Sequence, residues 1–330
     1  MTTKYKNVYI KSTGVVVGPY ENKGPLSKLF DKHYDDMYFG EKTLEQAETK
    51  IMSDSIEVAL NKGNLKTNNI DLFIAGDLQN QITSSTYAAS KLNIPFLGIY
   101  TACATNTEGL GIGATYIESK ICKNVIVSVS SHNMVSERQF RNPTEYGAPK
   151  PGTATFTATG GATCILTNKK SKVRIESATI GIPVDYEQTD PMDMGSVMAP
   201  AAASTINRHL KDMGRTALDY DLILTGDLGT FGKEILKDFM KTEYGIELKN
   251  YNDCGVMLYD LKNQKDVQAG GSGPVCSALV IYSDIIKKLE NKELKRVLYV
   301  ATGALFSPTT VFQKSNIISI ANAISLESVE

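Results

Sequence analysis

Three side chains in the first half of the chain could carry out acid–base, nucleophilic or ligand-binding chemistry: Asp77, Cys103 and His132. Cys103 lies in the segment 99–106, between an apolar run and a glycine-rich stretch with helical spacing, and Thr105 adds a hydroxyl group there. The positive end of a helix dipole favours a thiolate, and it equally favours a bound anion. The alternative is that Cys103 is a small buried apolar residue.

His132 and Asn133 come just after the next apolar run, 125–129, and Asp77 closes the run before it. If these runs are parallel strands, their carboxyl ends form one crevice, which is where α/β sheets bind ligands. We therefore expect these side chains, together with Cys103 and Thr105, to contact a ligand. Two other interpretations stay open, because His132 could cap the following helix and Asp77 could cap the helix after its own strand.

Arg138 and Arg141 are three residues apart, so they fall on one face of a predicted helix. Paired guanidinium groups bind carboxylates through two parallel hydrogen bonds. We predict that they supply positive charge to a carboxylate-bearing ligand. An exposed, charged turn is the alternative interpretation.

An internal repeat indicates how these residues are positioned. Residues 71–78 read DLFIAGDL and residues 221–228 read DLILTGDL, 150 positions apart. In each half a helical pattern precedes this phrase, and a cysteine, a helix and a strand (125–129 or 297–301) follow it. Buried strands that alternate with amphipathic helices predict an α/β fold with parallel strands covered by helices. We divide the chain into halves 1–168 and 169–330, with roughly 23 extra residues of the second half in 229–270.

Composition excludes several classes of protein. The net charge is −1 and basic residues do not cluster with aromatic ones, so we expect no nucleic-acid partner. Five widely spaced cysteines and three histidines predict free thiols and no metal site. We expect neither a signal peptide nor a transmembrane segment, because no apolar run is long enough.

A cysteine at a strand-to-helix junction of a duplicated α/β chain resembles the thiolase superfamily, which includes the ketoacyl synthases. The glycine turn and strand at 159–166 and the glycine-rich loop at 269–274 are similar to segments of that superfamily. The resemblance implies a five-layer αβαβα fold. Its two halves would be related by pseudo-twofold symmetry, each with a mixed, mostly parallel sheet. It also implies a possible homodimer.

Within the superfamily, segments along nearly the whole chain resemble the stage V sporulation protein AD family of spore-forming bacteria. These segments are 24–32, 75–78, 131–141, 143–147, 190–196, 198–203 and 301–305. This resemblance implies binding of dipicolinic acid, for uptake into the developing spore and release at germination. It also implies membrane-embedded partner proteins of the spore and peripheral association with the inner spore membrane.

The condensing enzymes of the superfamily assist their cysteine with a histidine and a second histidine or asparagine from the C-terminal half. Here the corresponding positions hold Gly226 beside Asp227, and Gly270, Gly271 or Ser272. We therefore expect a binding protein without a cofactor and not an enzyme, with Asp77 either orienting His132 or facing the calcium of a calcium–dipicolinate chelate. Two alternatives are an acyltransferase that uses Cys103 and a scaffold subunit of a membrane complex.

Overall fold

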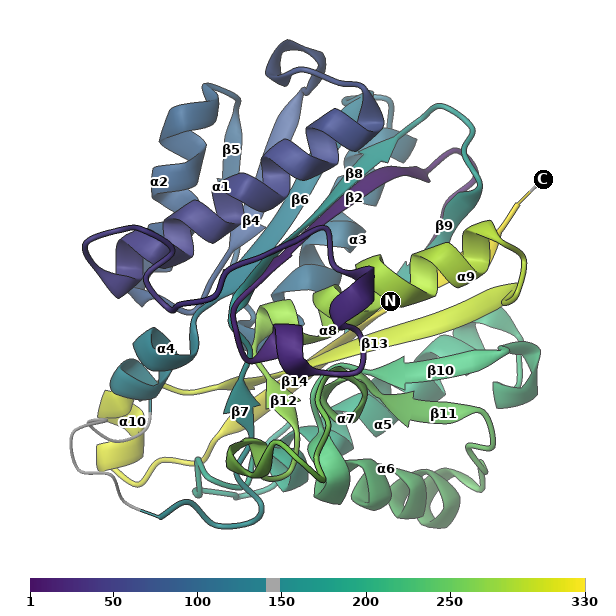
Figure 1. Ribbon diagram of the computed structural model, residues 1–330. Coiled ribbons are helices and arrows are strands. Elements are labelled where there is room, and N and C mark those ends of the chain that lie inside the picture. The colour runs from purple at the N-terminus through teal and green to yellow at the C-terminus, as the bar shows by residue number, and fades with distance from the viewer. Residues whose placement is uncertain (141–148, 330) are drawn as a thin grey trace.

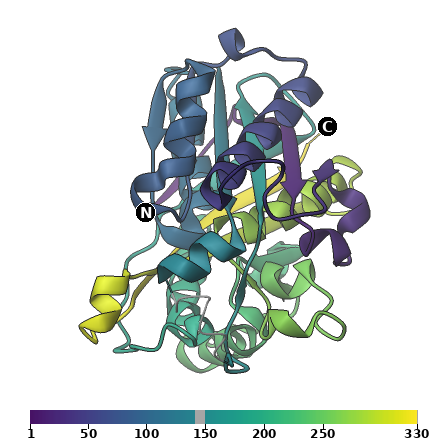
Figure 2. The ribbon, with the colours of Figure 1, turned by 60° about the vertical axis from the view of Figure 1, so that its left-hand side comes forward.

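The computed structural model describes residues 1–140 and 149–329, which form two halves with the same strand order (Figures 1 and 2). The strands and helices of the first half are β1 (Thr2–Lys4), β2 (Tyr9–Val17), β3 (Lys32–His33), α1 (Leu44–Gly63), β4 (Leu72–Gly76), α2 (Thr83–Leu92), β5 (Phe96–Gly98), α3 (Thr105–Glu118), β6 (Asn124–Ser131), α4 (Asn133–Phe140), β7 (Phe156–Thr157) and β8 (Gly160–Thr167).

The second half repeats this succession with an added segment between its third strand and its last long helical region. Its elements are β9 (Val173–Thr179), α5 (Met194–Met213), β10 (Leu222–Thr225), α6 (Gly229–Tyr244), β11 (Tyr251–Asp253), α7 (Cys254–Leu258), β12 (Gly271–Ser272), α8 (Pro274–Val280), α9 (Ile286–Glu290), β13 (Arg296–Leu305), α10 (Pro308–Phe312) and β14 (Ile318–Ser328). A π-helical turn at Ile281–Ile285 joins α8 to α9. The added segment, 254–273, contains α7 and β12. It lies in the last part of the expected region, 229–270, and ends a few residues beyond it.

The two halves have corresponding strand orders, β5-β4-β6-β8-β2 and β11-β10-β13-β14-β9. In each half the first two pairings are parallel and the last two are antiparallel. The pairing in each half is thus mixed, but the expectation that it is mostly parallel was wrong. Parallel pairing requires a crossover, which the helices between β4, β5 and β6 provide, whereas no crossover helix covers the return from β13 to β14.

The two groups of five strands belong to one continuous sheet, which is joined where β2 and β9 share one pairing, Tyr9 with Arg174. Strand β1 adds to it by pairing with β9, and β3 by pairing with β2. Helices α1 and α2 contact the first group of strands, and α5 contacts β13 and β14 of the second. Helix α3 contacts strands of both halves, and α8 contacts β6 and β8 of the first half, so second-half residues are carried into the first-half core. Three large apolar clusters result among the described residues: one under α1 and α2, one around α3 and α8, and one under α5 and α6. A fourth, small cluster consists of Val16, Phe39, Ala47 and Ile51.

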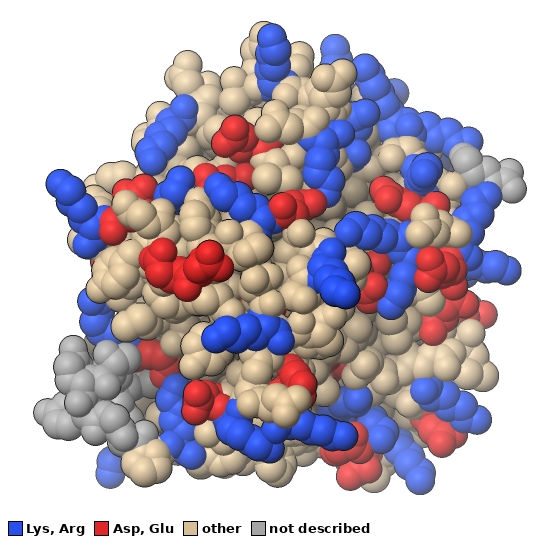
Figure 3. Space-filling view, in the orientation of Figure 1, with Lys and Arg blue, Asp and Glu red and all other residues tan. Residues whose placement is uncertain are grey.

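Local sequence explains where the principal helices begin and end. Thr43 accepts a hydrogen bond from the Gln46 amide at the start of α1, and Asp193 accepts one from the Ser196 amide at the start of α5. Helix α5 ends at Gly214, which has the left-handed conformation that glycine adopts without strain. On the face shown in Figure 3, acidic and basic side chains are interspersed and form no large area of one sign.

Candidate functional site

Cys103 lies where the chain passes from β5 into α3, as the sequence predicted. A short 3₁₀ turn, Ala102–Ala104, separates the two elements, and Ala102 adopts a left-handed conformation with φ of 50°. Thr105 stabilises this turn, since its hydroxyl donates to the Ala102 carbonyl oxygen at 2.6 Å and accepts from the Thr101 amide at 3.1 Å. Thr105 is therefore a buried structural residue that does not line the cavity next to Cys103.

Second-half strand β13 closes tightly against this turn. A side chain at Gly303 would clash with the carbonyl oxygen of Thr101, so only glycine permits this close approach. The consequence is that residues from the C-terminal half of the chain come within contact distance of the Cys103 side chain.

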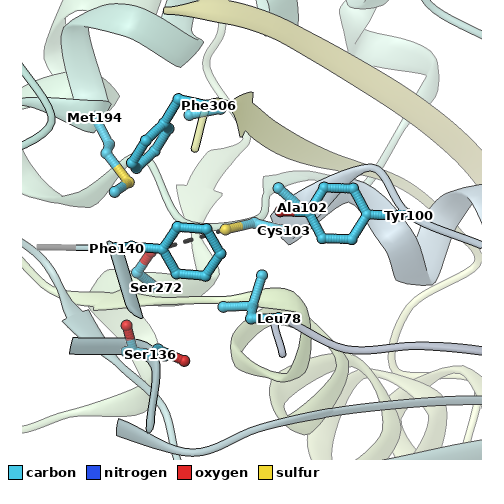
Figure 4. A pocket seen from close by; sticks show the side chains of 11 residues that line it. Leu78, Tyr100, Ala102, Cys103, Ser136, Phe140, Met194, Ser272 and Phe306 are labelled. Atoms are coloured by element: carbon cyan, nitrogen blue, oxygen red, sulfur yellow. Dashed lines mark hydrogen bonds between the residues drawn. The ribbon is translucent and has the colours of Figure 1, made fainter. Parts of the chain in front are cut away.

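The Cys103 side chain lies at the wall of a small cavity of about 30 Å³ between the two halves (Figure 4). The cavity is lined by Leu78, Tyr100, Ala102, Cys103, Ser136, Phe140, Thr157, Met194, Ser272, Ala304 and Phe306. The rings of Phe140 and Phe306 meet edge to face with centroids 5.7 Å apart. Within the described ranges, 1–140 and 149–329, the lining is mostly aromatic and aliphatic, with four hydroxyl groups (one of them the phenol of Tyr100) and one thiol, and it includes no lysine or arginine.

A chain of polar contacts connects Cys103 to Asp227, which follows β10. The Cys103 sulfur lies 3.9 Å from the Ser272 hydroxyl oxygen, and that hydroxyl donates to Asp227 Oδ2 at 3.1 Å. Asp227 also accepts from the Gly273 amide at 3.1 Å and from the Thr302 hydroxyl at 3.0 Å. Ser272 and Asp227 thus stand beside the sulfur, at two of the positions where the sequence indicated that a histidine and an amide are missing.

Burial and negative charge determine whether Cys103 and Asp227 are protonated. Burial raises the pKa of the Cys103 thiol well above its usual range, and the Asp227 carboxylate raises it further. Burial likewise raises the pKa of Asp227 to about 6. Near neutral pH the arrangement therefore favours a protonated thiol, although the helix dipole of α3 alone would favour a thiolate.

Asp77 does not face the Cys103 cavity. It is fully buried, and its carboxylate accepts from the Gln79 amide at 2.9 Å and from the Ser85 amide and hydroxyl at 2.8 and 2.6 Å. It holds the turn that leads from β4 into α2, so the structure favours the capping interpretation. The prediction that Asp77 contacts the ligand is not supported by this geometry, because the neighbouring Leu78, and not Asp77, lines the cavity.

His132 and Asn133 also lie outside the cavity lining. The His132 ring is buried, with Nε2 2.9 Å from the Met37 carbonyl oxygen, and burial lowers its pKa. Asn133 donates from its side chain to the Thr157 carbonyl oxygen at 3.1 Å and from its backbone amide to the Thr159 hydroxyl at 2.9 Å. Asn133 thereby positions Thr157, which does line the cavity.

Neither of the two predicted arginines is found next to Cys103 within the described residues. The Arg138 guanidinium pairs with the Glu45 carboxylate in a surface cleft, together with Gln79, Asn80 and Pro308. Arg138 is thus on a different surface from the cavity around Cys103. Arg141 lies outside the described residues.

Comparison of the sequence with known proteins identifies the family of the chain. Residues 2–327 match the family described as stage V sporulation protein AD. Over 321 residues the chain is 47% identical to stage V sporulation protein AD of Bacillus subtilis (strain 168), covering 97% of this chain and 94% of that protein.

The chain belongs to the stage V sporulation protein AD family.

The fold of this family member is similar to that of thiolase-like condensing enzymes. It matches 3-oxoacyl-[acyl-carrier-protein] synthase III from Aquifex aeolicus VF5 with a TM-score of 0.59 and 14% identity, over 97% of this chain and 99% of that one. It matches a cerulenin-bound OleA from Xanthomonas campestris with a TM-score of 0.63 and 14% identity, over 98% of both chains. At this level of identity, the likeness concerns the fold.

Sequence reasoning found Cys103 but missed most of the side chains around it. Phe140, Met194 and Phe306 come from segments far apart in the sequence, and none has a residue type that signals chemistry. For Ser272 a signal was present, because it belongs to the glycine-rich loop singled out by resemblance. Asp227 had its own signal in the repeated Gly-Asp-Leu phrase.

Two further searches concern the described residues alone. In residues 1–140 and 149–329, no group of three or more histidine, cysteine, aspartate or glutamate side chains is placed to hold a metal ion. Over the same ranges, none of the helices has both the length and the apolar character needed to cross a membrane.

Proposed function

We propose that this chain binds dipicolinate non-covalently in the cavity beside Cys103. In this proposal it serves uptake of the compound into the developing spore and its release at germination. It would act with membrane-embedded spore proteins, associated peripherally with the inner spore membrane. The observation that carries the non-covalent part is the identity of the groups next to the sulfur, which are the Ser272 hydroxyl and, behind it, the Asp227 carboxylate.

A nucleophilic cysteine needs a base or a positive charge to form the thiolate. All three histidines of the chain are described, and each has a location away from Cys103: His33 is half exposed at the surface, His132 packs against Met37, and His209 lies between Thr179 and Tyr220. Asp227 adds a negative charge where thiolate chemistry would require a positive one. These positions favour binding over acyl transfer.

The cavity has the kind of surface that suits a small planar aromatic ligand, because ligand pockets combine apolar walls with a few polar groups. At about 30 Å³ it is smaller than such a ligand, so the proposal requires the side chains around it to move apart when the ligand binds. Here Phe140, Phe306 and Tyr100 provide aromatic surface, and Ser136, Thr157 and Ser272 provide hydroxyl groups that can donate to a carboxylate. Because the lining found within 1–140 and 149–329 carries no cation, the neutral calcium chelate is included in the proposal beside the free dianion.

We also infer that the two halves form five layers related by a pseudo-twofold axis. Support comes from the repeated strand order and from α3, which contacts strands of both halves. In this arrangement the carboxyl end of β5 and the turn after β10 meet at the centre of the molecule, and there Cys103 lies near Asp227.

Isothermal titration with dipicolinate, with calcium and with a chelator, tests the proposal. Replacing a cavity hydroxyl, Ser136→Ala or Ser272→Ala, should weaken binding about five- to tenfold, because each removes a hydrogen bond worth about 1 kcal/mol or slightly more. Cys122→Ala is the control, since Cys122 is a buried thiol that does not line the cavity. Equal affinity of the wild type and both serine variants would place the ligand elsewhere. Absence of any dipicolinate binding would favour a scaffold role, and turnover of acyl-CoA would favour an acyltransferase.

A further inference from the structure

The donor in the hydrogen bond between Ser272 and Asp227 bears on whether the Cys103 sulfur is a thiol or a thiolate. Ser272 has a single hydroxyl proton, and it donates this proton to Asp227 Oδ2. The Ser272 oxygen therefore presents its lone pairs to Cys103, 3.9 Å away, and can accept from a thiol S–H. A thiolate at the same place would face these lone pairs and, behind them, a carboxylate.

Asp227 is held by neutral donors alone. Its oxygens accept from the hydroxyls of Ser272 and Thr302 and from the backbone amide of Gly273, and 1% of the residue is exposed. A carboxylate that is buried without a cation keeps its full negative field, since no counter-charge cancels it.

The other titratable groups around Asp227 are carboxyl, thiol and phenol groups, which are either negatively charged or neutral. Asp253, from β11, is a second buried carboxyl, and Cys254 of α7 and Cys276 of α8 are buried thiols. Tyr100, from the loop before Cys103, faces the sulfur from the first half. Among the described residues, no lysine, arginine or histidine is hydrogen-bonded to Asp227 or to Ser272.

We propose that Asp227 acts through Ser272 as a positioning residue that keeps Cys103 protonated, so that the cavity holds its ligand without covalent chemistry. This inference rests on the proposed function for its purpose, but the state of the sulfur can be measured without any ligand. The same chain of contacts protects the thiol from alkylation and oxidation, both of which proceed through the thiolate.

The test is the pH dependence of Cys103 alkylation by iodoacetamide in the ligand-free protein, followed by mass spectrometry of the Cys103 peptide between pH 7 and 10. Asp227→Asn removes the charge and keeps the shape of the side chain. We expect the midpoint of the profile to fall by about one pH unit or more, which gives about tenfold faster alkylation at pH 8. Because burial still acts on the thiol in the variant, both rates should keep rising up to pH 10, with the profile of the variant displaced to lower pH.

Two further variants keep the result decisive. Ser272→Ala breaks the chain of contacts and should also accelerate alkylation, by less than Asp227→Asn because the carboxylate remains. Asp284→Asn is the matched control, because Asp284 is a buried carboxylate paired with Lys288 and should leave the Cys103 profile unchanged.

Identical profiles for wild type and Asp227→Asn would overturn the inference. So would an acceleration that is much larger for the bulkier reagent N-ethylmaleimide than for iodoacetamide, because that would indicate a wider entrance. Titration of the wild type with dipicolinate is a separate measurement that tests the proposed function. Failure to bind dipicolinate would overturn the proposed function and leave the alkylation result standing.

Discussion

The same Gly-Asp-Leu phrase lies at the end of β4 in the first half and directly after β10 in the second, yet its two aspartates have different hydrogen-bond partners. Asp77 accepts from two backbone amides and one hydroxyl and holds the start of α2. Asp227 accepts from Ser272, Gly273 and Thr302 and faces the cysteine of the other half. In the second half Asp253 accepts from the Leu228 and Gly229 amides instead.

The added segment of the second half explains this exchange of roles. It places α7 directly after β11, so that Asp253 reaches the turn into α6, and it brings β12 with Ser272 onto Asp227. The capping carboxylate is thus supplied by the neighbouring strand, and Asp227 becomes available for the centre of the molecule. The sequence repeat kept the aspartate at the same place after its strand, but two of the three hydrogen-bond partners of Asp227, Ser272 and Gly273, come from the added segment.

The largest expected effect is a difference in the free energy of unfolding between variants of the two aspartates. Asp77→Asn should lower the free energy of unfolding by about 2–3 kcal/mol, because its amide NH₂ would face a backbone N–H donor that then lacks an acceptor. Asp227→Asn should change it by about 1 kcal/mol or less. In that variant the side-chain amide oxygen can accept from the Gly273 amide, and the Thr302 hydroxyl can rotate to accept from the new NH₂. Urea unfolding at pH 7.5 measures both, and equal destabilisation would show that the two aspartates have the same role.

An effect of comparable size, which depends on pH, concerns the buried acids around Asp77. Glu48 is fully buried and hydrogen-bonded to Gln79 and Ser130, and burial, with the Asp77 carboxylate as second cause, raises its pKa to about 8. Between pH 4.5 and 8 the folded protein therefore binds more protons than the unfolded chain, so its stability falls as the pH rises. Glu48→Gln removes this titration and should gain about 2–3 kcal/mol relative to wild type on going from pH 5 to pH 8.

The second half offers a control for this pH effect. Asp227, with a pKa of about 6, should produce a loss of stability in the same direction that is complete at lower pH, so the benefit of Asp227→Asn should level off earlier. Urea midpoints at pH 5, 6, 7 and 8 resolve the two curves. A Glu48→Gln variant whose difference from wild type does not vary with pH would mean that Glu48 is already ionised in the folded protein at pH 5.

The smallest expected effect sharpens the contrast between the cavity and the outer cleft. The Arg138–Glu45 pair is about half exposed, and exposed ion pairs contribute roughly 0–1 kcal/mol. Arg138→Ala should therefore change the unfolding midpoint little and the dipicolinate affinity less than about threefold. Titration beside Ser272→Ala checks this. A larger loss for Arg138→Ala would assign the ligand to the outer cleft and would confirm the sequence prediction that Arg138 contacts it.

The parts of the structure that sequence predicted are those set by local patterns. The helix after Thr43, the strands that contain 125–129 and 297–301, and the junction at Cys103 depend on periodicity, capping and turn residues within a few positions. The site residues were harder, because Asp77 and His132 have types that suit either a ligand or a satisfied interior, and sequence does not reveal their hydrogen-bond partners. Their partners, Ser85 for Asp77 and Met37 for His132, were named by no pattern.

The amino-acid sequence alone determined that this chain is a duplicated α/β protein with a cysteine at a helix start, because hydrophobic periodicity and repetition are properties of the chain itself. Which side chains surround that cysteine was decided by the tertiary structure. Ser272 and Asp227 approach Cys103 because Gly303 lets β13 pack against Thr101 and because β12 pairs with β7 across the two halves. Contacts between residues more than a hundred positions apart depend on how whole layers pack, and side-chain hydrogen bonds follow from that packing.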